Sequence, residues 1–412
     1  MAFSLFSRGD STKAKITSLP PPVTGGKWYP GHYIKLEQWQ VLNGDGSLNT
    51  SMINTIKAEL RNTFCLRGIK FVLSWGNIEN VTTGVSNWNW SVVNALVQML
   101  YALKQETPSK SARLLIAWNY RADGTTTADK LEILPPDLIS KTWSFTNGSP
   151  TTGAHNGYYL QLWDATVQTR LKTFLQEFAN HVVPGTDGKS LDDGDYLITV
   201  STLESAIRNA YLGNYNGGSL AMFQNGIIKA FASGDSMIKS MKTVFPKTPV
   251  CFGGNYTRPF MASVFPMLPG MKVGINTPNG NESNGLNDPS GNPGILVYYQ
   301  NPTYQNNIIL TCEAQGDDYK ATTGIDARSN KAALYDIPPY SVILARQRDL
   351  LKINYMIWQR NEPFWSGGNF TEDGINFGTV PSLLTFLQTH PALNVVSDPA
   401  GGLVKTLPTN WI

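Results

Sequence analysis

The sequence predicts a closed (β/α)8 barrel, an α/β fold of the TIM-barrel type, with elaborated loops after its third and sixth strands. Three observations lead to this prediction: eight short apolar runs, segments of helical period between them, and a length of 412 residues. Strands that alternate with helices indicate βαβ units and a parallel sheet. No glycine-rich dinucleotide-binding fingerprint accompanies the runs, so eight strands favour a closed barrel over an open sheet.

The eight apolar runs are short and nearly continuous in hydrophobicity. Strands of a parallel sheet have this pattern because helices bury both of their faces. The runs are 33–36, 68–75, 112–118, 195–201, 248–252, 271–275, 307–312 and 354–358. Each is therefore expected to form one barrel strand.

Amphipathic segments lie between the runs, with apolar residues three and four positions apart. Helices are predicted over 52–64, 90–103, 164–178, 220–241 and 380–387, with Asp164 capping the third of them. Residues 293–299 could form either a short helix or an extra strand. The helix is favoured as the sixth crossover, because a parallel connection needs about a dozen residues.

Residues 1–26 are polar and end in a triple proline followed by two glycines, so we expect a lead-in segment before a single barrel domain at 27–412. The N-terminus lacks the basic start and apolar core of a secretory signal. No run reaches the roughly 18 apolar residues of a membrane span. We therefore expect no membrane insertion, and a cytoplasmic location or release by lysis or as part of a particle.

Composition excludes several classes of function. Lys and Arg total 33 against 30 Asp and Glu, so the chain lacks the basic excess typical of nucleic-acid binding. The four histidines are scattered and the three cysteines lie in apolar surroundings, which favours buried thiols over a metal site. No phosphate-binding glycine motif occurs. We predict no metal and no cofactor.

Two glutamates stand out at the carboxyl ends of the predicted strands, where barrel active sites are built. Glu204 follows the fourth strand and Glu313 ends the seventh. Strands four and seven are three steps apart in an eight-fold ring, so their ends face each other across the barrel mouth. Two facing carboxyl groups suit glycoside hydrolysis, in which one donates a proton and the other attacks the anomeric carbon.

Polar and aromatic side chains near the other strand ends are candidates for sugar binding, through stacking and hydrogen bonds to hydroxyls. They are His32, Trp75, Trp118, Asn119, Arg121, Asn255, Tyr256, Asn276, Gln315 and Trp358. Each tryptophan is equally consistent with barrel packing, although at least one of the three is expected to stack on a sugar. His32 is equally consistent with a buried core histidine. Arg121 could instead pair with Asp123.

The pattern resembles the retaining glycoside hydrolases of clan A, also called the 4/7 superfamily. The resemblance rests on Glu204 at the end of Ile-Thr-Val-Ser-Thr-Leu-Glu, on Glu313 at the end of Ile-Ile-Leu-Thr-Cys-Glu, and on the amphipathic segment 162–182 before the fourth strand. Trp358 matches a position where such enzymes often place a tryptophan under the sugar. The resemblance implies Glu204 as acid/base, Glu313 as nucleophile and an oligo- or polysaccharide substrate.

The chain also departs from that family. Leu203 stands before the acid/base, where the family commonly has an asparagine. The sixth strand ends in Asn276-Thr277, where a tyrosine often orients the nucleophile, and Tyr256 or Tyr299 could substitute for it. These differences bear on the sugar that the chain accepts and leave room for a barrel without catalysis.

Retaining chemistry predicts carboxyl groups about 5–5.5 Å apart. Asp317 and Asp318 are rival nucleophiles if the strand register differs, and Glu204 could simply cap a helix. An alternative function is a non-catalytic carbohydrate-binding or structural barrel of a secreted or viral assembly. A weaker alternative is a barrel hydrolase that acts on an acyl or amide bond.

Overall fold

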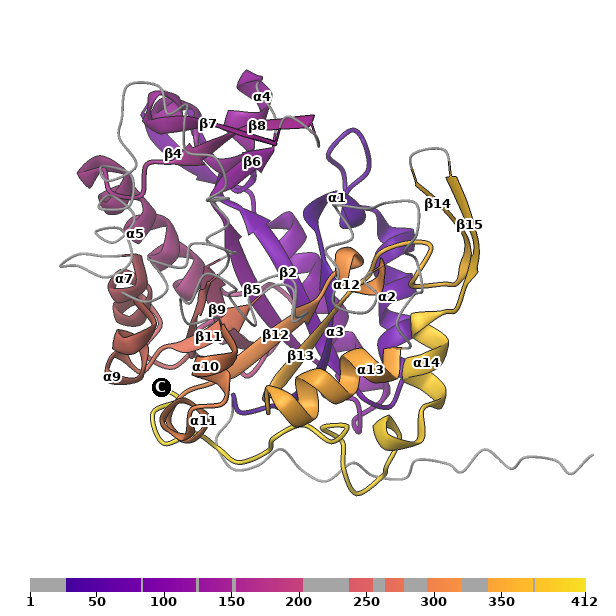
Figure 1. Cartoon of the computed structure of the whole chain (residues 1–412). Helices are drawn as coiled ribbons and strands as arrows, with labels where there is room; N and C mark the ends of the chain where they lie inside the picture. Colours follow the sequence, from indigo (N-terminus) through magenta and orange to yellow (C-terminus); the bar gives the residue numbers. More distant parts are fainter. Residues whose placement is uncertain are drawn as a thin grey trace, which may run out of the picture.

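The computed structural model describes residues 27–82, 84–123, 126–149, 153–202, 237–254, 264–277, 295–320, 340–372 and 375–412. Eight parallel strands close into a barrel in the order β1-β13-β12-β11-β10-β9-β5-β2 (Figure 1). This arrangement confirms the (β/α)8 barrel that the sequence predicts. The lead-in segment 1–26 lies outside the described residues.

Each predicted run contains or overlaps one barrel strand. The strands are β1 (Gly31–Leu36), β2 (Leu66–Ser74), β5 (Arg113–Asn119), β9 (Leu197–Thr202), β10 (Val250–Gly253), β11 (Gly274–Thr277), β12 (Leu310–Ala314) and β13 (Tyr355–Gln359). Almost every residue in them is buried. Their continuous hydrophobicity therefore reflects burial on both faces of the sheet.

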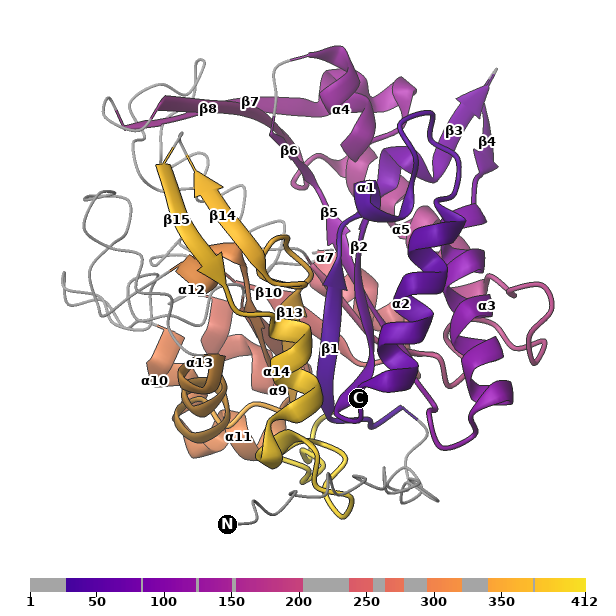
Figure 2. The same ribbon diagram turned by 90° about the vertical axis from the view of Figure 1, so that its right-hand side faces the viewer.

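Helices cover the outside of the barrel (Figures 1 and 2). The main ones are α2 (Thr50–Asn62), α3 (Ser91–Glu106), α5 (Ala165–Asn180), α7 (Met237–Val244), α10 (Ile295–Tyr299), α11 (Pro302–Asn307), α13 (Tyr340–Ala345) and α14 (Leu383–Thr389). The Asp164 side chain caps α5, accepting from the backbone N–H groups of Thr166 and Val167 at 2.9 and 3.2 Å. Residues 295–299 are helical, as predicted for the sixth crossover.

Shorter helical turns complete the connections. They are α1 (Gln38–Val41), α4 (Thr127–Ile133), α9 (Leu268–Met271), α12 (Gly316–Lys320), 3-10 turns at Trp75–Asn77, Pro136–Lys141, Phe265–Met267 and Pro391–Leu393, and a π-helical turn at Arg346–Leu350. The predicted helix over 220–241 is described only from Met237, where α7 begins.

Small antiparallel sheets stand on the side of the barrel to which the strands point (Figure 2). They are β3 (Glu79–Thr82) with β4 (Val85–Trp88), β6 (Arg121–Asp123) with β8 (Gly153–Leu160) and β7 (Thr142–Ser149), and β14 (Gly368–Glu372) with β15 (Ile375–Val380). The second sheet forms the elaborated connection predicted after the third strand. Residues 278–294, in the connection after the sixth strand, lie outside the described residues.

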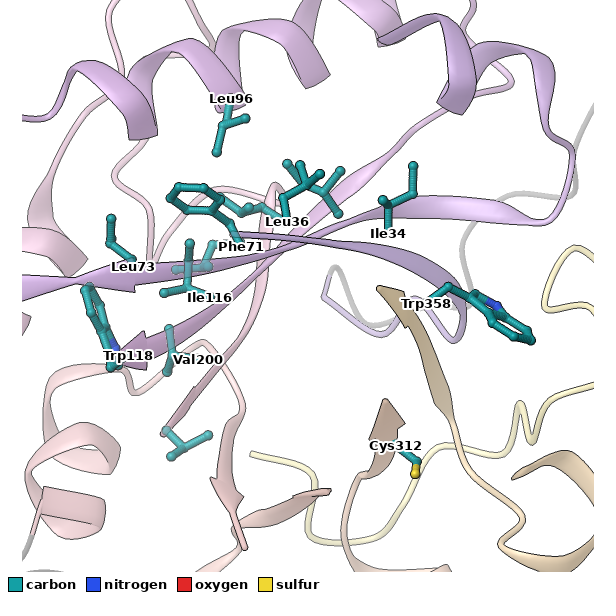
Figure 3. Packing of buried hydrophobic residues seen from close by; sticks show 14 of the residues in the cluster. Ile34, Leu36, Phe71, Leu73, Leu96, Ile116, Trp118, Val200, Cys312 and Trp358 are labelled. Atoms are coloured by element: carbon teal, nitrogen blue, oxygen red, sulfur yellow. The ribbon is translucent and has the colours of Figure 1, made fainter. Parts of the chain in front are cut away.

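The buried apolar side chains form two clusters, one inside the barrel and one between the strands and the surrounding helices. The inner cluster takes one or two residues from strands around the ring: Tyr33, Leu115, Ile198, Cys251, Ile309, Tyr355 and Ile357, closed by Trp28 and Tyr29. The outer cluster contains the alternate strand residues, and there Leu36 and Phe71 point toward Leu96 of α3 (Figure 3). Side chains of one strand therefore alternate between the barrel interior and the helix layer.

Phe174 of α5 lies at the centre of an aromatic group on the outer face. Its ring stacks on Trp75 at 5.5 Å and meets Trp118 edge-on at 4.9 Å between centroids. Because this side chain is fully buried, we expect Phe174→Ala to lower the free energy of unfolding by about 3–5 kcal/mol. Urea titration followed by tryptophan fluorescence measures this, with the exposed Val342→Ala as control. A cost below about 1 kcal/mol would contradict this packing.

Candidate active site

Glu313 lies near the carboxyl end of β12 with 1% of its surface exposed. Oε2 accepts from the Gln315 Nε2 amide at 2.9 Å and from Lys35 Nζ at 3.0 Å. Oε1 accepts from Lys70 Nζ and, at 3.3 Å, from Asn276 Nδ2. Among the described residues, two cationic and two amide donors therefore hold this carboxylate, with two donors on each oxygen.

The strands bring both lysines to Glu313 through register and alternation. Lys35 of β1 pairs with Lys70 of β2, so the two residues lie at one level of the barrel. Ile34 and Leu36 belong to the outer cluster, which directs Lys35 inward. The strand β13 separates β1 from β12, and a lysine side chain is long enough to reach across it.

The charges around Glu313 decide its protonation state. Burial alone would raise the pKa of its carboxyl, but Lys35 and Lys70 hold that pKa well below its usual range. Burial lowers the pKa of Lys70, and Glu313 opposes that shift. Lys35 also contacts Glu37 at 3.1 Å. Among the described residues, this group contains two cations and two carboxylates, and the two lysines favour the ionised form of Glu313.

Asn276 connects Glu313 to the sixth strand of the barrel. Its side-chain oxygen accepts from the Thr311 hydroxyl at 2.6 Å, which fixes the amide so that Nδ2 faces the carboxylate. The Tyr299 hydroxyl lies near Thr277 Oγ1 at 2.8 Å and donates to the Thr311 carbonyl oxygen at 2.5 Å. Among the described residues, Asn276 of β11 hydrogen-bonds Glu313, whereas the Tyr299 hydroxyl bonds to Thr277 and Thr311 instead.

Glu204 lies outside the described residues, and so do Asn255 and Tyr256. The strand β9 is described to Thr202, two residues before Glu204. In the ring, β9 and β12 are separated by β11 and β10, three steps apart as the sequence predicts. The expected distance between the two carboxyl groups remains a prediction.

His32 and Trp358 lie together on the outer face of the barrel, and both are fully buried. The indole N–H of Trp358 donates to His32 Nδ1 at 3.1 Å, and His32 Nε2 contacts the Gly401 carbonyl oxygen at 3.3 Å. The Trp358 ring packs on Phe386 of α14. The structure therefore does not bring these two residues to the barrel mouth and favours the packing alternative for both.

Trp75 and Trp118 also point outward, into the aromatic group around Phe174. Both are 2% exposed, and the Trp75 indole donates to Glu79 Oε2 at 2.6 Å. Trp118 belongs to the outer cluster, whereas Leu115 of the same strand belongs to the inner one. For these tryptophans, too, the structure favours packing over sugar binding.

Asn119 and Arg121 lie where β5 passes into the small sheet at the rim. Asn119 Nδ2 donates to Ser74 Oγ at 3.2 Å, and its side-chain oxygen accepts from the Arg121 backbone N–H at 3.1 Å. Both residues are half-buried. Of the rival acids, Asp318 is buried and accepts from the Gln315 backbone N–H at 2.8 Å, so it supports the residue that binds Glu313.

Lys35 and Lys70 are the functional candidates that sequence reasoning missed. Each is a single charged residue within an apolar run, and such a residue is buried only when it has a partner. That signal was present in both strands. Trp39 of α1, in the connection after β1, has a 74% exposed side chain.

Two properties of the described part of the chain bear on other functions. None of its helices combines the length and the apolar character that crossing a membrane requires. No group of three or more His, Cys, Asp or Glu side chains in that part could hold a metal ion. The three cysteines are free and buried.

Comparison with known proteins gives structural neighbours only. No family model matches the sequence, and no curated protein matches it. A glycoside hydrolase family 5 mannosidase from Rhizomucor miehei is 11% identical, with a TM-score of 0.44 over 93% of this chain and 97% of that one. An endo-1,4-beta-D-mannanase from Thermotoga petrophila is 10% identical, with a TM-score of 0.42 over 80% and 88%.

Endo-glycoceramidase II from a Rhodococcus species is also 10% identical, with a TM-score of 0.44 over 90% of this chain and 81% of that one. At such identities and TM-scores, the similarity supports no conclusion about the function of this chain. Its function is therefore argued from its own residues.

Proposed function

We propose that this chain is a retaining glycoside hydrolase that cleaves O-glycosidic bonds of an oligo- or polysaccharide, with Glu313 as nucleophile and Glu204 as acid/base. The observation that carries the proposal is an ionised carboxylate inside the barrel, near the carboxyl end of its seventh strand. Active sites of this fold are built at that end of the barrel.

The reaction would run in two displacements. Glu204, protonated, gives its proton to the leaving oxygen as the glycosidic C–O bond breaks, while an oxygen of Glu313 bonds to the anomeric carbon. Glu204, now ionised, then takes a proton from a water molecule whose oxygen attacks the same carbon and releases Glu313. The lysines support the first step because they keep Glu313 deprotonated.

Substrate contacts would come from polar groups around the mouth. Asn276 and Gln315 touch the proposed nucleophile, so their amides lie near the position of the reacting sugar. Asn119 and Arg121 lie at the rim, and Asn255 and Tyr256 remain candidates for hydroxyl binding. The exposed Trp39 ring could stack on a sugar face, as indoles do in carbohydrate sites.

A screen of fluorogenic glycosides and polysaccharides tests the activity, with NMR of the first product formed. We expect hydrolysis of at least one glycan class, with a product that initially keeps the anomeric configuration of the substrate. Inversion of configuration would exclude double displacement. Hydrolysis that persists in Glu313→Gln would exclude Glu313 as nucleophile.

A second function, a carbohydrate-binding barrel without catalysis, is favoured by one observation. Both Glu313 oxygens already accept from two donors, so attack on carbon requires that a donor be displaced. Glycan binding without hydrolysis by concentrated protein, measured by calorimetry on the same panel, would favour this function over the first.

A further inference from the structure

Lys35 lies between two carboxylates near the end of the first barrel strand. Its Nζ is 3.0 Å from Glu313 Oε2 and 3.1 Å from Glu37 Oε1. Glu37 directly follows β1, at the end of the barrel where active sites of this fold are built. The Glu37 side chain is 24% exposed, whereas those of Lys35 and Glu313 are 6% and 2% exposed. One buried cation is therefore shared between a buried acid and a half-buried one.

Lys70 holds the other oxygen of Glu313 in a different way. Among the described residues, Glu313 is the one carboxylate that pairs with Lys70, and the contact is made through Oε1. Asn276 donates to the same oxygen at 3.3 Å, and the Thr311 hydroxyl fixes its amide. Because Lys70 is buried, separating its charge from this partner is costly. Oε1 is therefore the oxygen that keeps its donors, and Oε2 is the one that can release a cation.

The backbone of Glu37 is anchored to the end of the last barrel strand. Its N–H donates to Gln40 Oε1 at 2.8 Å, and Gln40 Nε2 donates to the Arg360 carbonyl oxygen at 2.7 Å. Arg360 follows β13 and pairs with Glu59 of α2 at 3.1 Å. Glu37 is thus held in place as an acceptor for Lys35.

The charge on Glu313 changes during the proposed reaction. As Oε2 bonds to the anomeric carbon, the electron pair of the glycosidic bond passes to the leaving oxygen, which takes a proton from Glu204. The Glu313 carboxylate becomes a neutral ester, and its carbonyl oxygen, Oε1, still accepts from Lys70. Lys35 then loses one of the two negative charges beside it, and Glu37 supplies the other.

We propose that Glu37 is a positioning residue for the first displacement, because it draws Lys35 away from Glu313 Oε2 and so makes that oxygen the nucleophile. This inference rests on the proposed hydrolysis and adds to it which oxygen attacks and which group releases it. In the second displacement the Glu313 carboxylate forms again and Lys35 returns to it. Glu37 therefore favours the first displacement and opposes the second.

Glu37→Gln tests the proposal because it keeps the size of the side chain and removes the charge that attracts Lys35. A 2-deoxy-2-fluoro glycoside measures both displacements. Loss of activity gives the rate constant of the first, and recovery after the excess reagent is removed gives that of the second. We expect the first rate constant to fall at least about ten-fold, as the loss of a hydrogen bond between charged groups implies. The second should stay equal or rise, whereas a residue needed only for the fold would slow both.

Three further variants identify the group through which Glu37 acts. Glu37→Asp keeps the charge and should retain more of the first rate constant than Glu37→Gln does. In a Lys35→Met chain, Glu37→Gln should change neither rate constant, because the cation is gone. Glu106→Gln is the matched control: Glu106 also pairs with a lysine, Lys57, and its replacement should leave both rate constants unchanged.

The outcomes separate this inference from the proposed function. If the sugar ester forms on Glu313 but Glu37→Gln leaves the first rate constant unchanged, or slows both displacements equally, the inference is overturned and the proposed function stands. If no glycoside forms an ester on Glu313, both are overturned. If Lys35→Met does not fold or react, the two rate constants of Glu37→Gln decide.

Discussion

Glu313→Gln is expected to lower kcat by at least about a thousand-fold on any glycoside that the chain hydrolyses. The reason is that the uncharged amide of glutamine has no negatively charged oxygen that could bond to the anomeric carbon. Initial rates with the best substrate of the glycoside screen measure the loss.

Glu106→Gln is the matched control for this variant. Glu106 ends α3 and pairs with Lys57 and Arg61 on the protein surface, so its replacement should leave kcat unchanged. Equal rates for Glu313→Gln and the unaltered chain would show that this carboxylate takes no part in catalysis. Circular dichroism of both variants separates a loss of chemistry from a loss of fold.

Breaking the pair between Glu313 and Lys70 is expected to cost about 3–5 kcal/mol of unfolding free energy in either single variant, Glu313→Gln or Lys70→Met. Each leaves a buried charge with less compensation, since both side chains are almost fully buried. The double variant should cost clearly less than the sum of the two, because it removes both charges together. Urea titration of all four proteins measures this coupling.

The pH dependence of the same stabilities gives a second readout. The pKa of Glu313 is lower in the folded chain than in the unfolded one, so its contribution is fully present above the ordinary glutamate pKa of about 4.3 and declines as pH falls. The difference in unfolding free energy between the unaltered chain and Glu313→Gln should therefore become smaller at acid pH. Two results together would contradict the ion pair. One is that the losses of unfolding free energy in Glu313→Gln and Lys70→Met add up in the double variant at neutral pH. The other is that the difference between the unaltered chain and Glu313→Gln does not change with pH.

The barrel could be predicted from sequence because buried parallel strands and amphipathic helices leave local patterns. The rim sheets could not, since β6, β7 and β8 lie in a segment rich in Thr, Gly and Ser whose pairing is set by contacts distant in sequence. The helix predicted from Val380 begins instead at Leu383. Ser382 caps it there, accepting from the Thr385 backbone N–H at 3.0 Å.

From the sequence, the site could be predicted only where a polar residue stands at the end of an apolar run. Glu313 follows an apolar run and could be identified from it. The apolar runs around Lys35 and Lys70 signal that each lysine needs a buried partner, but which partner it has depends on which strands meet in the ring. The alternation of side chains along each strand explains why the tryptophans point away from the barrel interior. In β13, Tyr355 and Ile357 belong to the inner cluster, which turns Trp358 outward, and Leu115 of β5 does the same for Trp118.

Trapping with a 2-deoxy-2-fluoro glycoside that carries a good leaving group tests the central claim most directly. The fluorine slows both displacements and the leaving group restores the first, so the covalent sugar ester accumulates. Mass spectrometry of a protease digest should place one sugar on the peptide that contains Glu313. Attachment to another residue, or hydrolysis of the same reagent by a Glu313→Gln chain, would contradict the account.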